Sequence, residues 1–345
     1  MADNPRVSVV LPTLNADAHL TEAIESILIQ TYSDFEILIV DDDSTDSTVS
    51  IAKSYNDERI RVLKRNEPEG LASALNDGID AANGEYIARH DADDLSSPDR
   101  LARQVAYLDT HPEVSLVGTA ARMISESGDE RGIRHVLERP TADDLLEKNQ
   151  FIHGSVMFRK ERVLEATGGY DTLFETSEDY DLWIRLANDH PVRNIDTPLY
   201  TLRLRQNSVF ADDLLSAKLY GRYASRRKAV GGDLDLDDQI QADGPYVIYQ
   251  QLSRAERSGL HAEIAQELLR YGRRKDAFTE AKRALKLAPT NIEAVGFAGL
   301  SAMPVRIIRA VIRGYRSKLN REIIAQNATL DTGTDTLTEA VDAIE

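Results

Sequence analysis

Residues 86–101 read YIARHDADDLSSPDRL and give the clearest single indication of the fold. YIARH has the pattern of a buried strand. Three carboxylates follow within four residues, at Asp91, Asp93 and Asp94. Like charges at this spacing raise one another's pKa unless something positive lies between them. The stretch therefore predicts a loop that binds a cation where a strand ends.

Outward from this stretch, the first third of the chain alternates strand-like and helix-like patterns. The expected strands are residues 7–11, 35–41, 60–63, 86–90 and 114–118. Two of the expected helices between them are residues 18–30 and 71–82. A third is capped by Thr45 and Ser47 and ends near residue 55. The fourth runs from Pro98 to about residue 111, with Ser97 as its cap. This order predicts an α/β fold, a doubly wound and mostly parallel sheet with helices on both faces.

Polar side chains follow the expected strands at their carboxyl ends, where parallel sheets bind ligands. They are Pro12, Thr13 and Asn15; Asp41, Asp42 and Asp43; Arg65 and Asn66; and Asp91, Asp93 and Asp94. We expect one crevice to collect them.

Size and composition limit the function classes. The 345 residues suggest roughly two domains at about 150 residues each. The formal net charge of −17 disfavours nucleic-acid binding and fits either a halophilic or an ordinary acidic protein. Without cysteine there is no disulfide or thiolate metal site. We see no signal peptide or membrane span and expect a cytoplasmic protein. Dinucleotide, P-loop and hydrolase-elbow motifs are absent.

Three acidic motifs each have a structural alternative. Asp91 and Asp93 point the same way on a strand and suit Mg²⁺ or Mn²⁺, but Asp-x-Asp alone is as readily a solvated turn. VDDDSTD (40–46) offers carboxylates to a nucleobase or ribose, or only caps the next helix, as we expect for Asp46. SEDYD (177–181) offers a general base, or acidic residues that stabilise a helix that Ser177 caps.

From about residue 211 onward the chain reads as helical. The segment DAFTEAKRALKLAPTNIEA resembles one tetratricopeptide-type hairpin, which we interpret as a packing helix pair. Residues 304–321 have the pattern of a basic amphipathic helix, for which an anionic membrane surface, a partner protein or ordinary packing are the alternatives. We expect residues 325–345 to be a disordered acidic tail.

Together these pieces resemble the family 2 glycosyltransferases, inverting nucleotide-sugar-dependent enzymes of GT-A fold. The matching stretches run from VSVVLPTLNADAHLTEAIESILIQTYSDFEILIVDDDSTDST through RNEPEGLASALNDGIDAANGEYIARHDADDLSSPDRL to FIHGSVMFRK, GGYD and SEDYDLWIRL. The resemblance implies a catalytic domain at 1–210, with a nucleotide-sugar half (1–118) and an acceptor half (119–210). A helical region at 211–324 follows it.

The resemblance also implies roles for particular residues. Pro12, Thr13, Asn15, Asp41, Asp42 and Arg65 would line the nucleotide site. Asp91 would contact the ribose or base and share with Asp93 a Mn²⁺ or Mg²⁺ ion. Asp179, next to Glu178, would be the general base, and His153 and Trp183 would contact the acceptor, although Trp183 is equally interpretable as core. Arg203 or Arg205 would clamp the phosphates. Relatives often have Gly at the position of Asp43, so we expect a strained turn there.

The expected donor is a nucleotide-diphosphate sugar, most simply a UDP-sugar, and the acceptor a glycan or polyprenyl-linked hydroxyl. A polyprenyl-phosphate sugar synthase and a non-catalytic nucleotide-sugar-binding partner in a glycan assembly complex are the alternatives. A lipid-linked acceptor would make the segment 304–321 useful, because it would hold the enzyme at the cytoplasmic face of the membrane.

Overall fold

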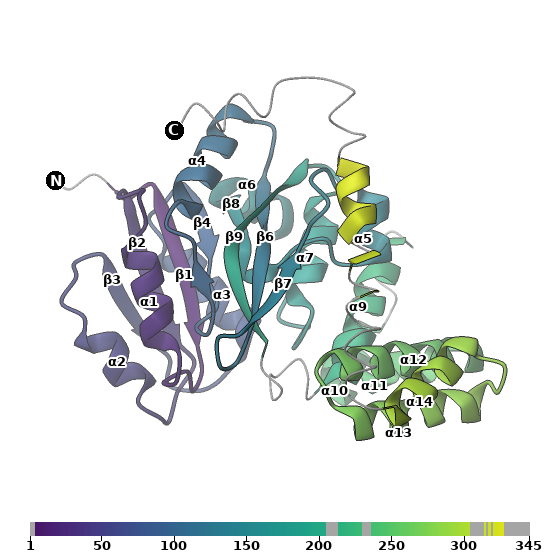
Figure 1. Ribbon diagram of the computed structural model, residues 1–345. Helices are drawn as coiled ribbons and strands as arrows, with labels where there is room; N and C mark the ends of the chain where they lie inside the picture. Colours follow the sequence, from purple (N-terminus) through teal and green to yellow (C-terminus); the bar gives the residue numbers. More distant parts are fainter. Residues whose placement is uncertain are drawn as a thin grey trace. The chain divides into compact units, whose positions relative to one another are not determined.

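A computed structural model describes residues 4–204, 213–229 and 236–303, together with 314, 317, 318 and 320–327. The chain divides into two compact units, Met1–Arg203 with Glu322–Glu345 and Leu204–Arg321, both drawn in Figure 1. The boundary between Arg203 and Leu204 lies a few residues before the boundary that we expected at 210. The described residues 322–327 group with the first unit, whereas we expected residues up to 324 to belong to the helical region.

The first unit is built on one nine-stranded sheet. The strand order is β3-β2-β1-β4-β8-β6-β9-β5, and β7 pairs with β6. The strands are β1 Val7–Thr13, β2 Phe35–Asp41, β3 Ile60–Lys64, β4 Tyr86–Arg89, β5 Leu95–Ser96, β6 Leu116–Ser125, β7 Glu130–Arg134, β8 Met157–Arg159 and β9 Val192–Leu204. The first four strands pair in parallel, as expected, but β4–β8, β8–β6, β6–β7 and β5–β9 are antiparallel. The sheet is therefore mixed.

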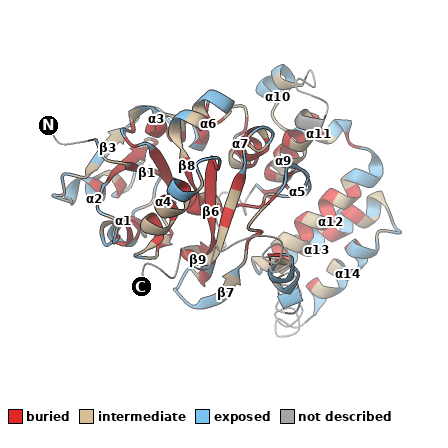
Figure 2. Ribbon diagram, turned by 90° about the horizontal axis from the view of Figure 1, so that it is seen from above, coloured by how far each residue is buried: buried red, intermediate tan, exposed pale blue. Residues whose placement is uncertain are grey.

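Helices cover both faces of the parallel half. They are α1 Leu20–Leu28, α2 Thr48–Ser54, α3 Leu71–Ala81 and α4 Arg100–Thr110. Figures 1 and 2 show α1 and α3 on opposite faces of this sheet. Every residue of β1 and β2 is buried, and Figure 2 shows β1 in red. Burial on both faces explains why both strands are mostly apolar and do not alternate with exposed polar residues.

The start of α4 differs from our expectation. The helix begins at Arg100 with Asp99 as its N-cap residue, not at Pro98 after a Ser97 cap. The preceding residues form β5, which pairs with β9, and the backbone N–H of Ser97 donates to the carbonyl of Leu199. The chain thus remains extended at 95–97 because β9 supplies its hydrogen bonds, a long-range pairing that no local pattern reveals.

The acceptor half contains elements that the sequence pattern left undefined. They are α5 Ala142–Glu147, the short 3-10 helix η1 His153–Ser155 and α6 Lys160–Thr167, whereas α7 Glu178–Leu186 is the helix expected after Ser177. The N-cap residue of α7 is Ser177, as expected, but it has φ 65° and makes no side-chain cap hydrogen bond. We expected disorder from residue 325, but residues 325–327 are helical. The side chain of Asn327 accepts a hydrogen bond from the Glu138 N–H and donates one to the carbonyl of Val136.

The second unit is helical. Its described helices are α9 Leu214–Ala229, α10 Asp237–Asp243, α11 Tyr246–Gln251, α12 Arg254–Arg270, α13 Arg274–Leu287 and α14 Ile292–Ala302. Buried alanines join the last three helices through Ala262, Ala284 and Ala294, so the expected packing helix pair is present as α13 and α14. Within the described residues, no helix combines the length and hydrophobicity needed to cross a bilayer.

Most of the basic segment 304–321 lies outside the described residues, as do Arg205 and residues 328–345. The expectations placed on these residues stay predictions.

Candidate active site

The side chains expected to line the nucleotide site lie where β1 and β2 end. Thr13 pairs with Asp41 in the sheet register, and its hydroxyl lies 3.4 Å from Oδ1 of Asp41. The next loop is joined to this edge by Asn15, whose backbone N–H donates to Ser44 and whose side-chain oxygen accepts from the Thr45 N–H. Pro12 lies within β1 and is buried. The sequence therefore placed these side chains at one edge correctly.

Asp42 is held in place from three directions. Its Oδ1 accepts from Arg65 Nη1 at 2.9 Å and from the Glu69 N–H, and its Oδ2 accepts from the Gly70 N–H at 3.0 Å. Arg65 also contacts Asp77 at 2.9 Å. Both oxygens of Asp42 are thus already hydrogen-bonded, and Arg65 orders this carboxylate.

The next residue in the chain, Asp43, has φ 64°, in the left-handed region. This conformation favours glycine because it has no Cβ, so the strained turn expected at Asp43 is present.

The carboxylate cluster follows β4 directly. Asp91 and Asp93 are half-buried, whereas Asp94 is buried and its carboxylate accepts from the backbone N–H of Arg203 at 2.7 Å. Burial raises the pKa of Asp94 well above its usual range, and the charges of Asp91 and Asp93 raise it further. Asp94 is therefore a structural member of the cluster, and Asp91 and Asp93 are its more exposed carboxylates.

A buried cation accompanies this cluster. Arg89, 2% exposed, places its Nη1 2.5 Å from Oδ1 of Asp91, and its Nε has no hydrogen-bond partner in the described part of the chain. The sequence reasoning missed Arg89, since it read the residue as part of a strand. The only available signal was a charged residue inside an otherwise apolar strand, two positions before the first aspartate.

The short helix η1 packs against the same cluster. A Cβ built on Gly154 would lie 2.5 Å from Oδ2 of Asp91 and 2.2 Å from the hydroxyl of Tyr200. That hydroxyl accepts from the backbone N–H of Asp91 at 3.0 Å. The close approach explains why this position requires glycine, and it places the neighbouring His153 beside the strand ends.

The carboxylate pair on α7 completes the site. Burial, and then the charge of Asp179, raises the pKa of Glu178 to about 8. Asp179 is less buried than Glu178, and its pKa is also raised by burial. Its Oδ2 accepts from Asn149 Nδ2 at 2.7 Å, and its Oδ1 accepts from the Tyr180 N–H at 2.7 Å. Asn149 was not among the predicted residues.

His153 joins this pair to the aromatic residues around it. Its Nε2 lies 3.0 Å from the Tyr170 hydroxyl, and its Nδ1 lies 3.5 Å from Oε1 of Glu178. Burial lowers the pKa of His153 well below its usual range, and the charge of Arg89 lowers it further, so the ring is neutral. His153, Glu178 and Asp179 each offer a ligand atom within 4.8 Å of the others, which is also a possible metal-binding group.

Trp183 is fully buried beneath this group, and its ring lies 6.1 Å from that of His153. This burial corrects the expectation that Trp183 stacks on an acceptor, and the core alternative describes it.

The guanidinium of Arg203 is also engaged, by the carbonyls of Asp93 and Glu126 and by the Glu22 carboxylate at 2.5 Å. In this structure Arg203 therefore supports the loop that carries Asp93.

Comparison with known proteins places the chain among glycosyltransferases. The family model described as Glycosyl transferase family 2 matches residues 8–168. EpsE of Bacillus subtilis (strain 168), provisionally named a glycosyltransferase, is 37% identical over 209 residues, which cover 59% of this chain and 74% of EpsE.

Two solved structures have a similar fold. S. aureus TarS 1-349 in complex with UDP-GlcNAc is 17% identical with a TM-score of 0.53, and the match covers 86% of this chain and 90% of TarS. The mannosyltransferase PcManGT from Pyrobaculum calidifontis, in complex with GDP-Man and Mn²⁺, is 20% identical with a TM-score of 0.52, and the match covers 96% and 89% of the two chains. The expected GT-A fold is thereby confirmed.

Proposed function

Because the chain belongs to glycosyl transferase family 2, we propose that it moves a sugar from a nucleotide-diphosphate donor to a hydroxyl of a glycan or lipid-linked acceptor, with inversion at the anomeric carbon. The observation that carries this proposal is the position of the α7 carboxylate pair. His153 and Gly154 are adjacent in η1; His153 contacts Glu178, and Gly154 leaves room for Asp91. The short helix η1 thus contacts both Asp91, which would bind the sugar nucleotide, and the carboxylate pair that would supply the base.

Asp179 is the better base of the two carboxylates. It is more exposed than Glu178, and two hydrogen bonds at 2.7 Å hold its oxygens in a fixed orientation. A general base must be ionised, must reach the acceptor hydroxyl and must be positioned before the reaction. Glu178, with its pKa of about 8, stays protonated at neutral pH and adds no second charge beside Asp179. Asp179 would then accept the proton as the acceptor oxygen attacks the anomeric carbon.

Asp91 and Asp93 are the residues that would hold Mn²⁺ or Mg²⁺. Their carboxylate oxygens are the hard ligands that these ions prefer. The side chain of Asp91 is 32% exposed, and its Oδ2 makes no hydrogen bond to any described residue. When bound, such an ion offsets negative charge that develops on the leaving diphosphate. His153 with the α7 pair fits this ion less well, because protonated Glu178 is a poor ligand.

The nucleotide of the donor could be uridine or guanosine diphosphate. A UDP-sugar is our expectation from the sequence, and TarS binds UDP-GlcNAc, whereas PcManGT binds GDP-Man. Thermal shift with UDP- and GDP-sugars, with and without Mn²⁺, distinguishes them, because a ligand that binds only the native state raises its stability.

The test of the activity is metal-dependent release of nucleotide diphosphate when an acceptor is added. We expect Asp179→Asn to retain donor binding but lose turnover, and Asp93→Ala to lose the metal-dependent part of donor binding. Transfer by Asp179→Asn at the wild-type rate would remove Asp179 from the role of base. Thermal shift of both variants separates lost chemistry from lost folding.

We also propose that the segment 304–321 lies on the cytoplasmic face of a membrane, where it would bring a lipid-linked acceptor to the enzyme. Its support is the sequence pattern alone: Arg306, Arg309, Arg313 and Arg316 recur at helical spacing among apolar residues. Deletion of this segment should lower recovery of the enzyme with membranes, and unchanged recovery would count against the proposal.

A further inference from the structure

Charge is distributed very unevenly between the two units. Residues 204–321 contain 21 Lys and Arg against 13 Asp and Glu, whereas the rest of the chain contains 20 against 45. The whole protein is acidic, so a basic helical unit is not explained by overall composition. Charge asymmetry between parts of a chain points to a partner of opposite charge for one of them.

Helix α13 concentrates this positive charge on its outer face. Ala277, Ala281 and Ala284 are buried on its inner face, where small side chains allow close helix packing. Lys275, Lys282, Arg283 and Lys286 are exposed, and Asp276 is the one acidic residue of this helix in the exposed class. Within the described residues, the three lysines make no ion pair, whereas Arg283 contacts Glu280 at 2.6 Å. The exposed charge on α13 is therefore mostly not neutralised by its own neighbours.

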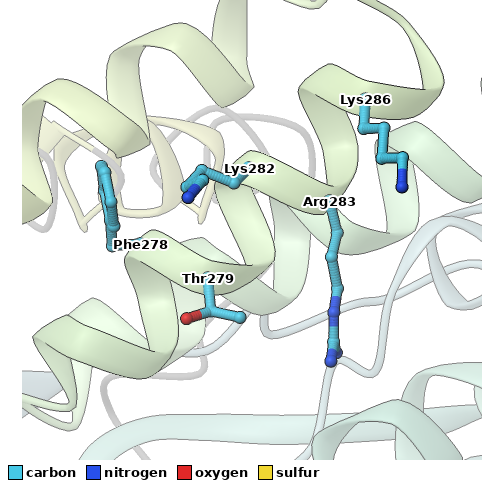
Figure 3. A pocket seen from close by; sticks show the side chains of 5 residues that line it. All are labelled: Phe278, Thr279, Lys282, Arg283 and Lys286. Atoms are coloured by element: carbon cyan, nitrogen blue, oxygen red, sulfur yellow. The ribbon is translucent and has the colours of Figure 1, made fainter.

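An aromatic ring lies among these cations. Phe278 is 41% exposed, and the Lys282 ammonium lies 5.5 Å from its ring centroid. The two side chains, with Thr279, Arg283 and Lys286, line a hollow of about 360 Å³ (Figure 3). All five residues come from one helix, so the hollow is a surface feature and not an enclosed pocket. The cationic side chains that line this hollow do not surround a single point, so they are poorly arranged to bind one small anion. This arrangement favours an extended anionic surface as the partner.

We propose that the outer face of α13 docks on an anionic phospholipid surface, with the lysines at the headgroups and Phe278 in the interfacial layer. A Lys or Arg near such a surface gains roughly fivefold in partitioning, and an aromatic ring prefers the boundary between headgroups and acyl chains. The described helix α14 adds apolar surface to the same hairpin, since Ile292 is 84% and Val295 54% exposed.

Co-sedimentation of the full chain with vesicles tests this. We expect binding to vesicles that contain phosphatidylglycerol, weaker binding as salt is raised, and little binding to phosphatidylcholine alone. Lys282→Glu with Lys286→Glu should lower partitioning roughly tenfold or more. Phe278→Ser should lower it without changing the salt dependence. The matched control is Lys53→Glu with Arg131→Glu, two exposed cations of the other unit with the same change in net charge.

Equal binding of wild type to neutral vesicles would overturn the proposal, as would no binding to anionic ones. So would an α13 variant that binds like the control, because the partner would then lie elsewhere. Circular dichroism confirms that the exposed substitutions leave the fold intact. Sugar transfer to a soluble acceptor without vesicles is measured separately, so failure of lipid binding is distinguishable from failure of the proposed enzyme activity.

Discussion

The guanidinium of Arg89 lies against the carboxylate of Asp91, with Nη1 2.5 Å from Oδ1. Arg89 is the last residue of β4 and is buried, whereas the side chain of Asp91 is 32% exposed. The chain thus carries its own cation at the place where clustered aspartates require one. This single charge offsets only part of the cluster, since Asp93 and Asp94 add two more carboxyl groups. Arg89 alone therefore leaves negative charge in the cluster, which is consistent with the divalent ion proposed for Asp91 and Asp93.

Replacement of this cation gives the first prediction. Arg89→Gln removes the partner of Asp91 and the positive charge that opposes the burial-raised pKa values of Glu178 and Asp179. We expect the acid limb of the pH dependence of kcat/KM to move to higher pH. We also expect the free energy of unfolding to fall by about 1–3 kcal/mol, less than for a fully buried pair because Asp91 is partly exposed. Urea unfolding and pH–rate profiles measure both effects.

Arg89→Lys is the control for that variant, because it retains the charge but not the forked geometry. It should keep the acid limb near its wild-type position even if kcat is lower. A Gln variant with an unshifted limb would show that Arg89 has no influence on the α7 pair.

Stability should depend on Glu178 in a defined pH window. Its pKa is raised from 4.5 to about 8, so the folded state holds a proton that the unfolded state releases. Between these two values, stability falls as pH rises, because the folded state binds more protons than the unfolded state. Glu178→Gln removes this dependence, and we expect it to be more stable than wild type at pH 9 by about 2–4 kcal/mol, with little difference at pH 4. Equal slopes of unfolding free energy against pH for both proteins would contradict this.

The parallel half of the fold was predictable because its signals are local. β1 and β2 are fully buried and mostly apolar, and polar residues lie at their carboxyl ends, the edge where parallel sheets generally bind ligands. The antiparallel half gave weak signals. β9 is a 13-residue strand with mixed burial, and β5 contains only two residues that are extended because β9 pairs with them. Long-range pairing of this kind has no local sequence signature.

The site follows the same division. Asp91 and Asp93 were proposed from motif and position, and the α7 pair from the family resemblance, since carboxylate chemistry is visible in residue type. Asn149 and Gly154 were not, because their roles depend on what folds against them: a carboxylate 30 residues later for Asn149, and Asp91 with Tyr200 for Gly154. Trp183 was assigned to the acceptor from helical spacing, which specifies a face of α7 but not whether that face is buried.

Asn149 should set the basicity of Asp179. Its amide donates to Oδ2 of Asp179 at 2.7 Å, and a hydrogen bond to the ionised form lowers a carboxyl pKa. Asn149→Ala should therefore raise the pKa of Asp179 and move the acid limb of kcat/KM to higher pH, with a severalfold loss of rate at pH 6 and a smaller loss at pH 8. Asn188→Ala, an exposed asparagine just after α7, is the control and should leave the profile unchanged. A uniform loss at all pH values would mean that Asn149 has only a structural role.

Gly154 should tolerate no side chain. A Cβ at this position would lie 2.2 Å from the Tyr200 hydroxyl and 2.5 Å from Oδ2 of Asp91, so Gly154→Ala must displace one of them. Overpacking of this kind typically costs about 1–3 kcal/mol, and displacement of Asp91 should also weaken metal-dependent donor binding. Gly259→Ala is the matched control: this glycine lies within α12 with open space around its Cβ position, so alanine should stabilise by about 0.4–1 kcal/mol. Urea unfolding and donor titration with Mn²⁺ measure the two effects, and donor affinity at the wild-type level in Gly154→Ala would separate η1 from the donor site.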